Sequence, residues 1–123
     1  MARPHESLQA WKEAMQLVRT IYDLTKTFPR EEIYGLAAQM RRAAVSVPSN
    51  LAEGAARSSK KEFSQFLSMA KGSLSELETQ LLISADLGYL DRGNGVFDLA
   101  VRVAKLLAGL HRKASATQKD ARE

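Results

Sequence analysis

The sequence predicts an all-α protein that folds as a single-domain, antiparallel up-and-down four-helix bundle. Apolar residues recur at steps of three and four over four long segments, which is the period of a helix with one buried face. Short segments containing serine, glycine or proline separate the four, and short connections favour antiparallel neighbours. The 123 residues, of which 45% are hydrophobic and 26% charged, suffice for one domain with one core.

The composition also restricts the class of protein. The chain has no cysteine, which excludes disulfides and thiolate metal sites. No run approaches the roughly 18 consecutive apolar residues of a membrane span, and the first residues lack the apolar core of a signal peptide. We therefore expect a cytoplasmic protein that has no membrane contact.

The first two helices are expected over residues 8–25 and 30–57. Pro29 separates them, since proline disfavours helix at the residue before it and suits a first helical turn. Pro48 lies inside the second helix, where it removes one backbone hydrogen bond and crowds the carbonyl of Ala44. We expect a kink at this position, and a break into two helices is the alternative.

The third helix is expected over residues 60–87. Ser59 and Glu62 have the spacing of a capping box, in which each side chain bonds to the backbone amide of the other. Gly88 suits the left-handed residue that commonly follows a helix. Gly72 lies in mid-helix, where the usual reason for a glycine is the close approach of a neighbouring helix.

The fourth helix is expected over residues 94–111, with Asn94 or Asp91 as its cap. The bundle then spans residues 1–113. The polar tail, residues 114–123, lacks apolar periodicity, so we expect it to be frayed or disordered.

A row of polar residues borders the apolar stripe of the second helix. It mixes cationic, anionic, amide and hydroxyl side chains, which is unlike a solvated face, and buried polar groups need partners. Folding the second helix back on the third pairs positions whose numbers sum to roughly 118, which sets Arg42 opposite Glu76. The same register sets Ser46 opposite Gly72. We expect a buried polar seam formed by Gln39, Arg42, Ser46, Asn50, Glu53, Ser68 and Glu76.

Charge is unevenly distributed along the chain. Residues 41–61 hold five basic and one acidic side chain, 5 − 1 = +4, whereas residues 62–88 hold one basic and four acidic side chains, 1 − 4 = −3. A basic segment of this kind suits contact with nucleic-acid phosphates, and an ordinary solvated helix end is the alternative. The candidate phosphate contacts are Arg41, Arg57, Lys60 and Lys61.

The remaining face of the second helix carries small apolar residues where a lone bundle would place charged ones. Small side chains allow close packing against another helix, and the basic segment of one copy complements the acidic segment of the next. Such contacts are heterologous, so they close into rings or continue as filaments. We therefore expect self-assembly through Ala38, Val45, Ala52 and Ala56.

The residues do not predict an enzyme, a metal site or a cofactor. His5 and His111 lie near the chain ends, and neither belongs to the Glu-x-x-His motif of di-iron bundles. Ser46 and Ser73 have no histidine partner for nucleophilic catalysis, and the chain has no glycine-rich phosphate loop. Three carboxylates could suggest acid–base chemistry, but structural ion pairing is favoured. Glu78 is expected nearly opposite the core, and arginines are expected near Glu53 and Glu76.

Several blocks of the sequence resemble one known family. They include QMRRAA at residues 39–44, SVPSNLAEG at residues 46–54 and LGYL at residues 87–90, within a match over residues 8–90. Together they resemble the 23S rRNA intervening-sequence proteins, which are encoded in insertions within ribosomal RNA genes and elsewhere in bacterial genomes. The resemblance implies a left-handed up-and-down bundle, a homopentameric ring and no established enzymatic activity.

The fold implied by this resemblance is similar to that of the accessory protein of diversity-generating retroelements, which binds nucleic acid and a reverse transcriptase. By this analogy, the expected partners are RNA or DNA and a nucleic-acid enzyme, besides further copies of the chain. A homo-oligomeric structural or protein-interaction module without nucleic acid is the alternative function.

Overall fold

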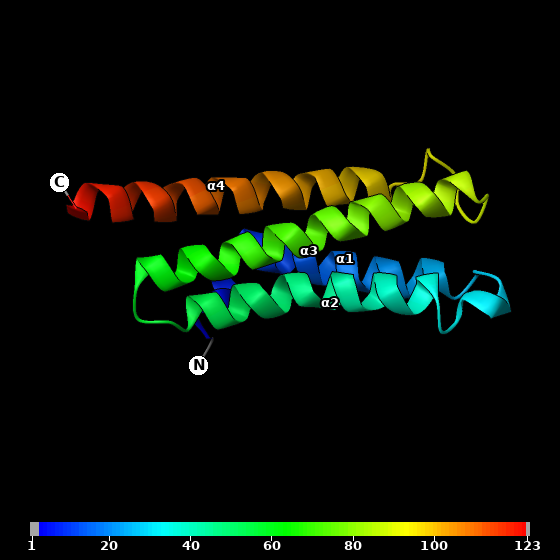
Figure 1. Cartoon of the computed structure of the whole chain (residues 1–123), viewed down its shortest axis with the longest axis horizontal. Coiled ribbons are helices and arrows are strands. Elements are labelled where there is room, and N and C mark those ends of the chain that lie inside the picture. Colours follow the sequence, from blue (N-terminus) through cyan, green and yellow to red (C-terminus); the bar gives the residue numbers. More distant parts are fainter. Residues whose placement is uncertain (1–2, 123) are drawn as a thin grey trace.

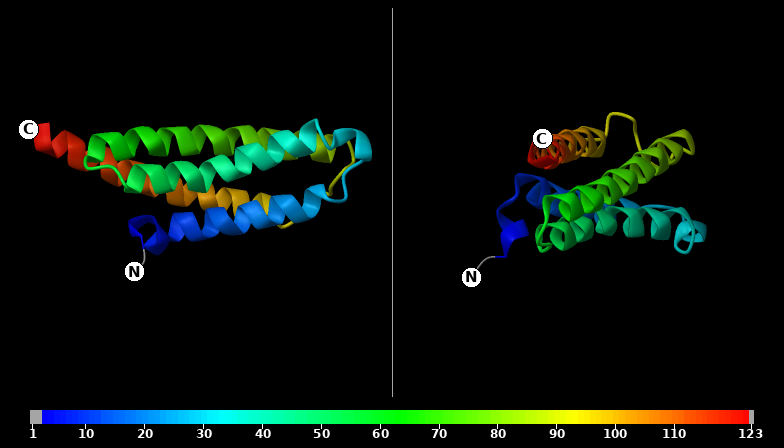
Figure 2. Two further views of the ribbon diagram at one scale, coloured as in Figure 1. Left: turned by 90° about the horizontal axis from the view of Figure 1, so that it is seen from below. Right: turned by 60° about the vertical axis from the view of Figure 1, so that its left-hand side comes forward.

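Four long helices make up the computed structural model, which describes residues 3–122. Figure 1 shows that consecutive helices run in opposite directions. Each helix packs against two neighbours, in the cyclic order of the chain, and Figure 2 shows the same bundle from two other sides. The predicted up-and-down four-helix bundle is confirmed. The elements are η1 (Pro4–Ser7), α1 (Gln9–Thr25), η2 (Arg30–Glu32), α2 (Leu36–Ala55), α3 (Lys60–Asp86) and α4 (Val96–Arg122), where η is a 3₁₀ turn.

The core runs along the bundle and receives apolar side chains from every long helix. Leu17 of α1, Met40 of α2, Leu81 of α3 and Leu107 of α4 are all fully buried. Burying one such side chain contributes about 1.5–3 kcal/mol. The apolar stripes read from the sequence therefore supply the main stabilisation of the fold. Within residues 3–122, no helix is long and apolar enough to cross a lipid bilayer.

The second helix begins later than predicted. The segment expected to be one helix over residues 30–57 is divided into η2 and α2, which begins at Leu36. Gly35 interrupts the helical path with φ −109° and ψ −115°. The carboxylate of Glu32 accepts a hydrogen bond from the Leu36 amide at 3.2 Å. This side chain thus satisfies an amide that the helix leaves without a partner, which stabilises the break.

Pro48 lies within α2, which continues from Leu36 to Ala55 without interruption. The alternative prediction of two separate helices is therefore wrong. Pro48 is buried, so its packing offsets part of the cost of the backbone hydrogen bond that proline removes. The kink at Pro48 stays a prediction.

The start of α3 follows the predicted capping signal in part. The hydroxyl oxygen of Ser59 accepts a hydrogen bond from the Glu62 amide at 3.1 Å, as an N-cap does. The Glu62 carboxylate accepts from the same hydroxyl at 3.2 Å, not from the Ser59 amide. Only one half of the capping box is therefore formed.

The end of α3 is a left-handed glycine, as predicted. Gly88 has φ +80°, a conformation that glycine adopts without steric cost. Its amide donates to the Ala85 carbonyl at 3.0 Å, and the Tyr89 amide donates to the Ser84 carbonyl at 2.9 Å. These two bonds form a Schellman motif, which satisfies carbonyls that the helix leaves without partners.

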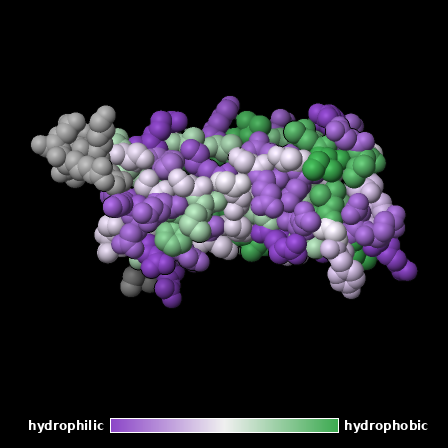
Figure 3. All heavy atoms as spheres, in the orientation of Figure 1, coloured by the Kyte–Doolittle hydropathy of each residue, from purple (hydrophilic) through white to green (hydrophobic). Residues whose placement is uncertain are grey.

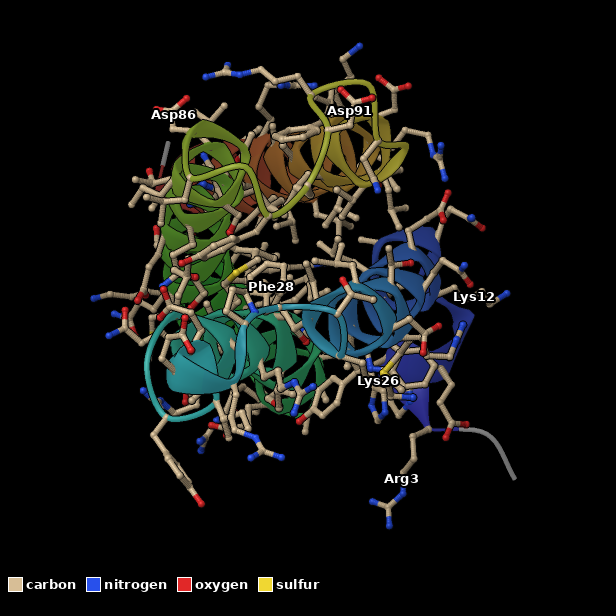
Figure 4. All side chains as sticks on the ribbon, turned by 90° about the vertical axis from the view of Figure 1, so that its right-hand side faces the viewer. Arg3, Lys12, Lys26, Phe28, Asp86 and Asp91 are labelled. Carbon is tan, nitrogen blue, oxygen red and sulfur yellow. The ribbon has the colours of Figure 1, made fainter. Side chains whose placement is uncertain are left out.

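Side chains from the two connections meet at one end of the bundle. The Tyr89 hydroxyl donates to the Glu32 carboxylate at 2.9 Å, and the Tyr89 ring lies 5.2 Å from the ring of Phe28. Figure 4 looks onto this end and shows Phe28 among the helices. The hydrogen bond to Glu32 raises the pKa of Tyr89 above its ordinary value. Beside this contact, the Asn94 carboxamide accepts from the Val96 amide at 2.9 Å, which selects Asn94 from the two predicted caps.

The fourth helix extends beyond its predicted end near residue 111. It continues to Arg122, so the segment predicted to be a disordered tail, residues 114–123, is helical as far as it is described. Glu123 lies outside the described residues. The physical reason is twofold: Ala114 is buried against the core, and three of the ten tail residues are alanine, the strongest helix former.

The glycine at which α2 and α3 approach closely is Gly54 and not Gly72. A Cβ atom on Gly54 would lie 2.7 Å from Cβ of Phe66 and 2.9 Å from Cδ1 of Phe63. A Cβ atom on Gly72 would meet nothing within 4 Å. The predicted close approach at Gly72 is wrong because this residue is exposed, away from the neighbouring helices.

The two ends of the bundle differ in what they contain. The first and last helical residues lie at the same end as the α2–α3 turn, and the other two connections lie at the opposite end (Figure 1). We call the end that holds the α2–α3 turn the turn end (residues 3–9, 53–64 and 108–116). We call the opposite end the connection end (residues 23–35 and 86–98).

Candidate nucleic-acid interface and assembly face

A polar cleft of about 220 Å³ lies between α2 and α3. At its base, the hydroxyl oxygens of Ser46 and Ser73 are 2.8 Å apart. The side-chain amide of Asn50 donates to the Ser46 carbonyl at 2.9 Å and to the Ser46 hydroxyl at 3.0 Å. The predicted register is thus correct to within one residue, since Ser46 meets Ser73 and not Gly72. The cleft is lined by Gln39, Arg42, Ala43, Ser46, Ser73 and Glu76.

Arg42 and Glu76 both line this cleft. The ion pairs found within 4.0 Å in residues 3–122 do not include one between them. Glu76 instead accepts a hydrogen bond at 3.2 Å from the side-chain amide of Gln80, one turn further along α3. Both charged side chains are exposed in the single chain. An exposed ion pair contributes only about 0–1 kcal/mol, which does little to hold two long side chains together. The predicted buried pair is therefore wrong.

Most of the predicted polar seam is exposed. Only Ser46 and Asn50 are half-buried in the single chain. The row lies beside the apolar stripe, so it follows the rim of the helix contact, where long polar side chains extend into water. The exposed members are Gln39, Arg42, Glu53, Ser68 and Glu76.

Arg41 is separated from the other candidate phosphate contacts. A rise of about 1.5 Å per residue places it roughly 24 Å from Arg57 along the helix axis. Its guanidinium carbon lies 4.7 Å from the centroid of the Tyr22 ring, and its Nε donates to the Thr25 hydroxyl at 2.9 Å. Arg41 therefore joins α1 to α2 through a cation–π contact and a hydrogen bond.

The other three candidates lie together at the turn end. Lys60 and Lys61 are exposed at the start of α3, and the Arg57 guanidinium lies 4.9 Å from the centroid of the Phe66 ring. Arg57 and Lys60 also line an open cleft of about 270 Å³ beside η1. Exposed cations on neighbouring turns suit contact with a phosphate backbone, which is charged along its whole length.

The net charge changes sign between the two ends. Residues of the turn end include six basic and three acidic side chains, 6 − 3 = +3. Residues of the connection end include three basic and six acidic side chains, 3 − 6 = −3. In Figure 4, Asp86 and Asp91 lie at the rim of the connection end. The bundle therefore has a basic end and an acidic end.

An apolar cleft of about 340 Å³ opens between α1 and α2. Two of the predicted assembly residues, Val45 and Ala52, line it together with Trp11 and Pro48. Val45 is 40% exposed, which is unusual for a β-branched apolar side chain at the middle of a helix. Of the other two predicted residues, Ala38 is half-buried and Ala56 is exposed.

A polar cluster between α3 and α4 is a feature that the sequence reasoning missed. His111 Nε2 lies 3.1 Å from the Ser64 hydroxyl, and its Nδ1 lies 3.3 Å from Nζ of Lys71. Burial and the neighbouring Lys71 both lower the pKa of His111. The available signal was the spacing, since Ser64, Ser68 and Lys71 recur at steps of four and three. His111 and Ser115 likewise lie one turn apart on the facing helix.

The described residues contain no group of three or more histidine, aspartate or glutamate side chains placed to hold a metal ion. Glu78, predicted to lie nearly opposite the core, is half-buried, and burial raises its pKa. The third helix packs against both α2 and α4, so less of its surface faces water than the apolar stripe alone suggests.

By its fold and these features, the chain is a small four-helix-bundle protein with open polar and apolar clefts between its helices. Residues 6–109 match the family model of the 23S rRNA-intervening sequence protein, and the chain belongs to this family. The match confirms the resemblance and extends it into α4. A comparison with curated proteins finds no significant match.

Proposed function

We propose that the chain is a non-enzymatic, cytoplasmic adaptor that assembles into a homopentamer and binds RNA or DNA through its phosphates. The observation that carries the proposal is the basic turn end, where Arg57, Lys60 and Lys61 are grouped. The five-membered ring follows from the family resemblance. The assembly face would be the apolar cleft that contains Val45 and Ala52.

Assembly matters to this function because charge adds up. A net charge of +3 at one end of a single chain gives weak attraction for a polyanion. A closed cyclic assembly places the same end of every copy on one rim. Each phosphate that the rim neutralises releases counterions, so affinity rises with the number of copies and falls with salt. A nucleic-acid enzyme bound to the same assembly is the further partner that the analogy suggests.

The test is binding of a fluorescently labelled single-stranded RNA at several salt concentrations. The wild-type protein should bind with an affinity that falls steeply as salt increases. The double variant Lys60→Gln/Lys61→Gln should bind more weakly. Its salt dependence, as log K against log salt, should be shallower by about 0.7 for each lost phosphate contact.

The matched control removes the same charge from elsewhere. Lys12 and Lys26 are exposed on α1 and at the connection end, so Lys12→Gln/Lys26→Gln changes the net charge equally. It should bind RNA almost as the wild type does. Equal losses in both variants would mean that net charge alone, and not the turn end, governs binding.

A protein-interaction oligomer without nucleic acid is the second candidate. Large apolar side chains are exposed toward the connection end, among them Tyr34 (95%), Leu87 (55%) and Ile33 (52%). Figure 3 shows hydrophobic residues gathered toward this end of the visible face. Exposed apolar groups of this kind mark protein contacts. An assembled protein that bound no RNA or DNA at low salt would favour this function.

A further inference from the structure

An open cleft of about 190 Å³ lies between α3 and α4 near the turn end. Liquid water occupies about 30 Å³ per molecule, so the volume exceeds what a five-atom oxyanion needs. The lining contains two cations, an imidazole and a hydroxyl, and it contains no acidic side chain. The lining residues are Lys71, Ala108, His111, Arg112 and Ser115.

Polar groups of the cleft, together with Ser64 and Ser68 beside it, lie within hydrogen-bond reach of one another. The Lys71 ammonium lies 3.3 Å from Nδ1 of His111 and only donates, so Nδ1 accepts and the neutral ring carries its proton on Nε2. That proton is donated to the Ser64 hydroxyl at 3.1 Å. The Ser68 and Ser115 hydroxyls lie 3.5 Å from Nε2 and from the Ser64 hydroxyl, respectively. Donors from two helices thus lie in the cleft or beside it.

The electrostatics of the cleft favour an anion. The charged groups that line the cleft with His111 are Lys71 from α3 and Arg112 from α4, and both are cations. Burial and the repulsion of Lys71 lower the pKa of His111, which favours the neutral imidazole. The cleft between α2 and α3 differs because Glu76 accompanies Arg42 there. A bound dianion between Lys71 and Arg112 would reverse the balance and allow His111 to take up a proton and become a further donor.

We propose that this cleft binds a phosphate group. Lys71 and Arg112 supply the charge, the Ser115 hydroxyl donates a hydrogen bond, and His111 donates once it is protonated. Inorganic phosphate, a phosphate monoester and a nucleic-acid backbone present the same chemistry to the cleft. The proposal does not depend on the proposed RNA binding, because free phosphate alone is able to test it.

The test follows the imidazole carbon-bound protons of the two histidines by NMR. Inorganic phosphate is added at pH 7 against a chloride reference of equal ionic strength. The His111 signal should shift and saturate, while the His5 signal should not. The His111 pKa should also be higher in sulfate, a tetrahedral dianion that does not titrate in this range, than in chloride. An unsaturable response, or the same response from both histidines, would overturn the proposal.

Variants separate the site from general charge. Lys71→Gln and Arg112→Gln should each weaken phosphate binding about tenfold, the effect of one lost charge-assisted hydrogen bond. Lys71→Gln should also raise the His111 pKa in the absence of phosphate, because the neighbouring cation is gone. Lys12→Gln on α1 is the matched control and should bind phosphate as the wild type does. All three side chains are exposed, and far-ultraviolet circular dichroism verifies that each variant is folded.

Two ligands identify the source of the phosphate. If a single-stranded RNA without terminal phosphates shifts the His111 signal at lower concentration than free phosphate, the site binds a nucleic-acid backbone. If phosphate and a monoester shift it and RNA does not, the site binds a small phosphate compound. Both results support a phosphate site. The absence of a saturable shift with every one of these ligands contradicts it.

Discussion

Ser46 carries the polar contact between α2 and α3. Its hydroxyl lies 2.8 Å from that of Ser73 and accepts from the Asn50 amide one turn along its own helix. Arg42 and Glu76, which flank this contact, are exposed and form no ion pair with each other. The short, half-buried side chains therefore contribute more to stability than the long charged ones beside them.

Replacement of Ser46 tests this contribution. Ser46→Ala should lower the free energy of unfolding by about 1 kcal/mol, because two hydrogen bonds are lost and Asn50 and Ser73 each lose a partner. Ser75→Ala is the matched control, since Ser75 is exposed on α3 and gains the same helix propensity. Urea unfolding at one protein concentration measures both. Equal changes in the two variants would show that the Ser46 hydroxyl contributes nothing specific.

The protonation of His111 gives a pH dependence with a definite sign. Its pKa in the folded protein is lower than its ordinary value of about 6.5, so the unfolded chain binds the proton more tightly. Stability should therefore be greatest above about pH 6.5 and should fall as the pH drops toward the folded-state pKa. Chemical unfolding at a series of pH values measures this. His111→Gln should remove this part of the decline, and an unchanged decline would assign it to other groups.

At the scale of the helices, one glycine allows a close contact between α2 and α3. Gly54 faces Phe63 and Phe66 across the contact, with no room for a methyl group. Gly72 lies in open space on the exposed side of α3. The same residue type thus has a packing role in one helix and none in its neighbour.

Substitution of these two glycines should change stability in opposite directions. Gly54→Ala should destabilise the protein by about 1–3 kcal/mol, since the added carbon would overlap Phe66 and force α2 and α3 apart. Gly72→Ala should stabilise it by up to about 1 kcal/mol, because alanine loses less backbone freedom in a helix. Thermal unfolding of both variants gives the comparison. A stable Gly54→Ala protein would mean that the two helices are able to separate at little cost.

The sequence predicts the elements of this fold better than the contacts between them. Each of the four helices has an apolar stripe with helical periodicity, and these stripes include Leu17 and Leu107. Gly88 is a local signal for a helix end that does not depend on other parts of the chain. Glu32 caps α2 while it also accepts from the distant Tyr89, and Ala114 is buried against other helices, so both depend on neighbours that a local pattern does not include. His111 was missed for the same reason, because its partners are distant in the chain.

At the scale of the whole molecule, the apolar cleft between α1 and α2 predicts association. Ala52→Glu would place a charge in that cleft and should reduce the assembled mass, while helicity persists because the core residues are untouched. Ala116→Glu is the control, since Ala116 is exposed on α4 and lies outside this cleft. Light scattering should give the wild type and the control five times the 13.6 kDa of one chain. A monomeric wild type would contradict the ring and the multiplied basic rim.

The position of the first and last helical residues at the turn end has a practical consequence for labelling (Figure 1). A fluorescent protein attached near Arg3 would lie beside the basic residues of the turn end and compete with a polyanion for space. An insertion between Asp91 and Gly95 would instead project from the acidic end, in an exposed loop. Reporters placed in this loop would leave the basic turn end open to solvent.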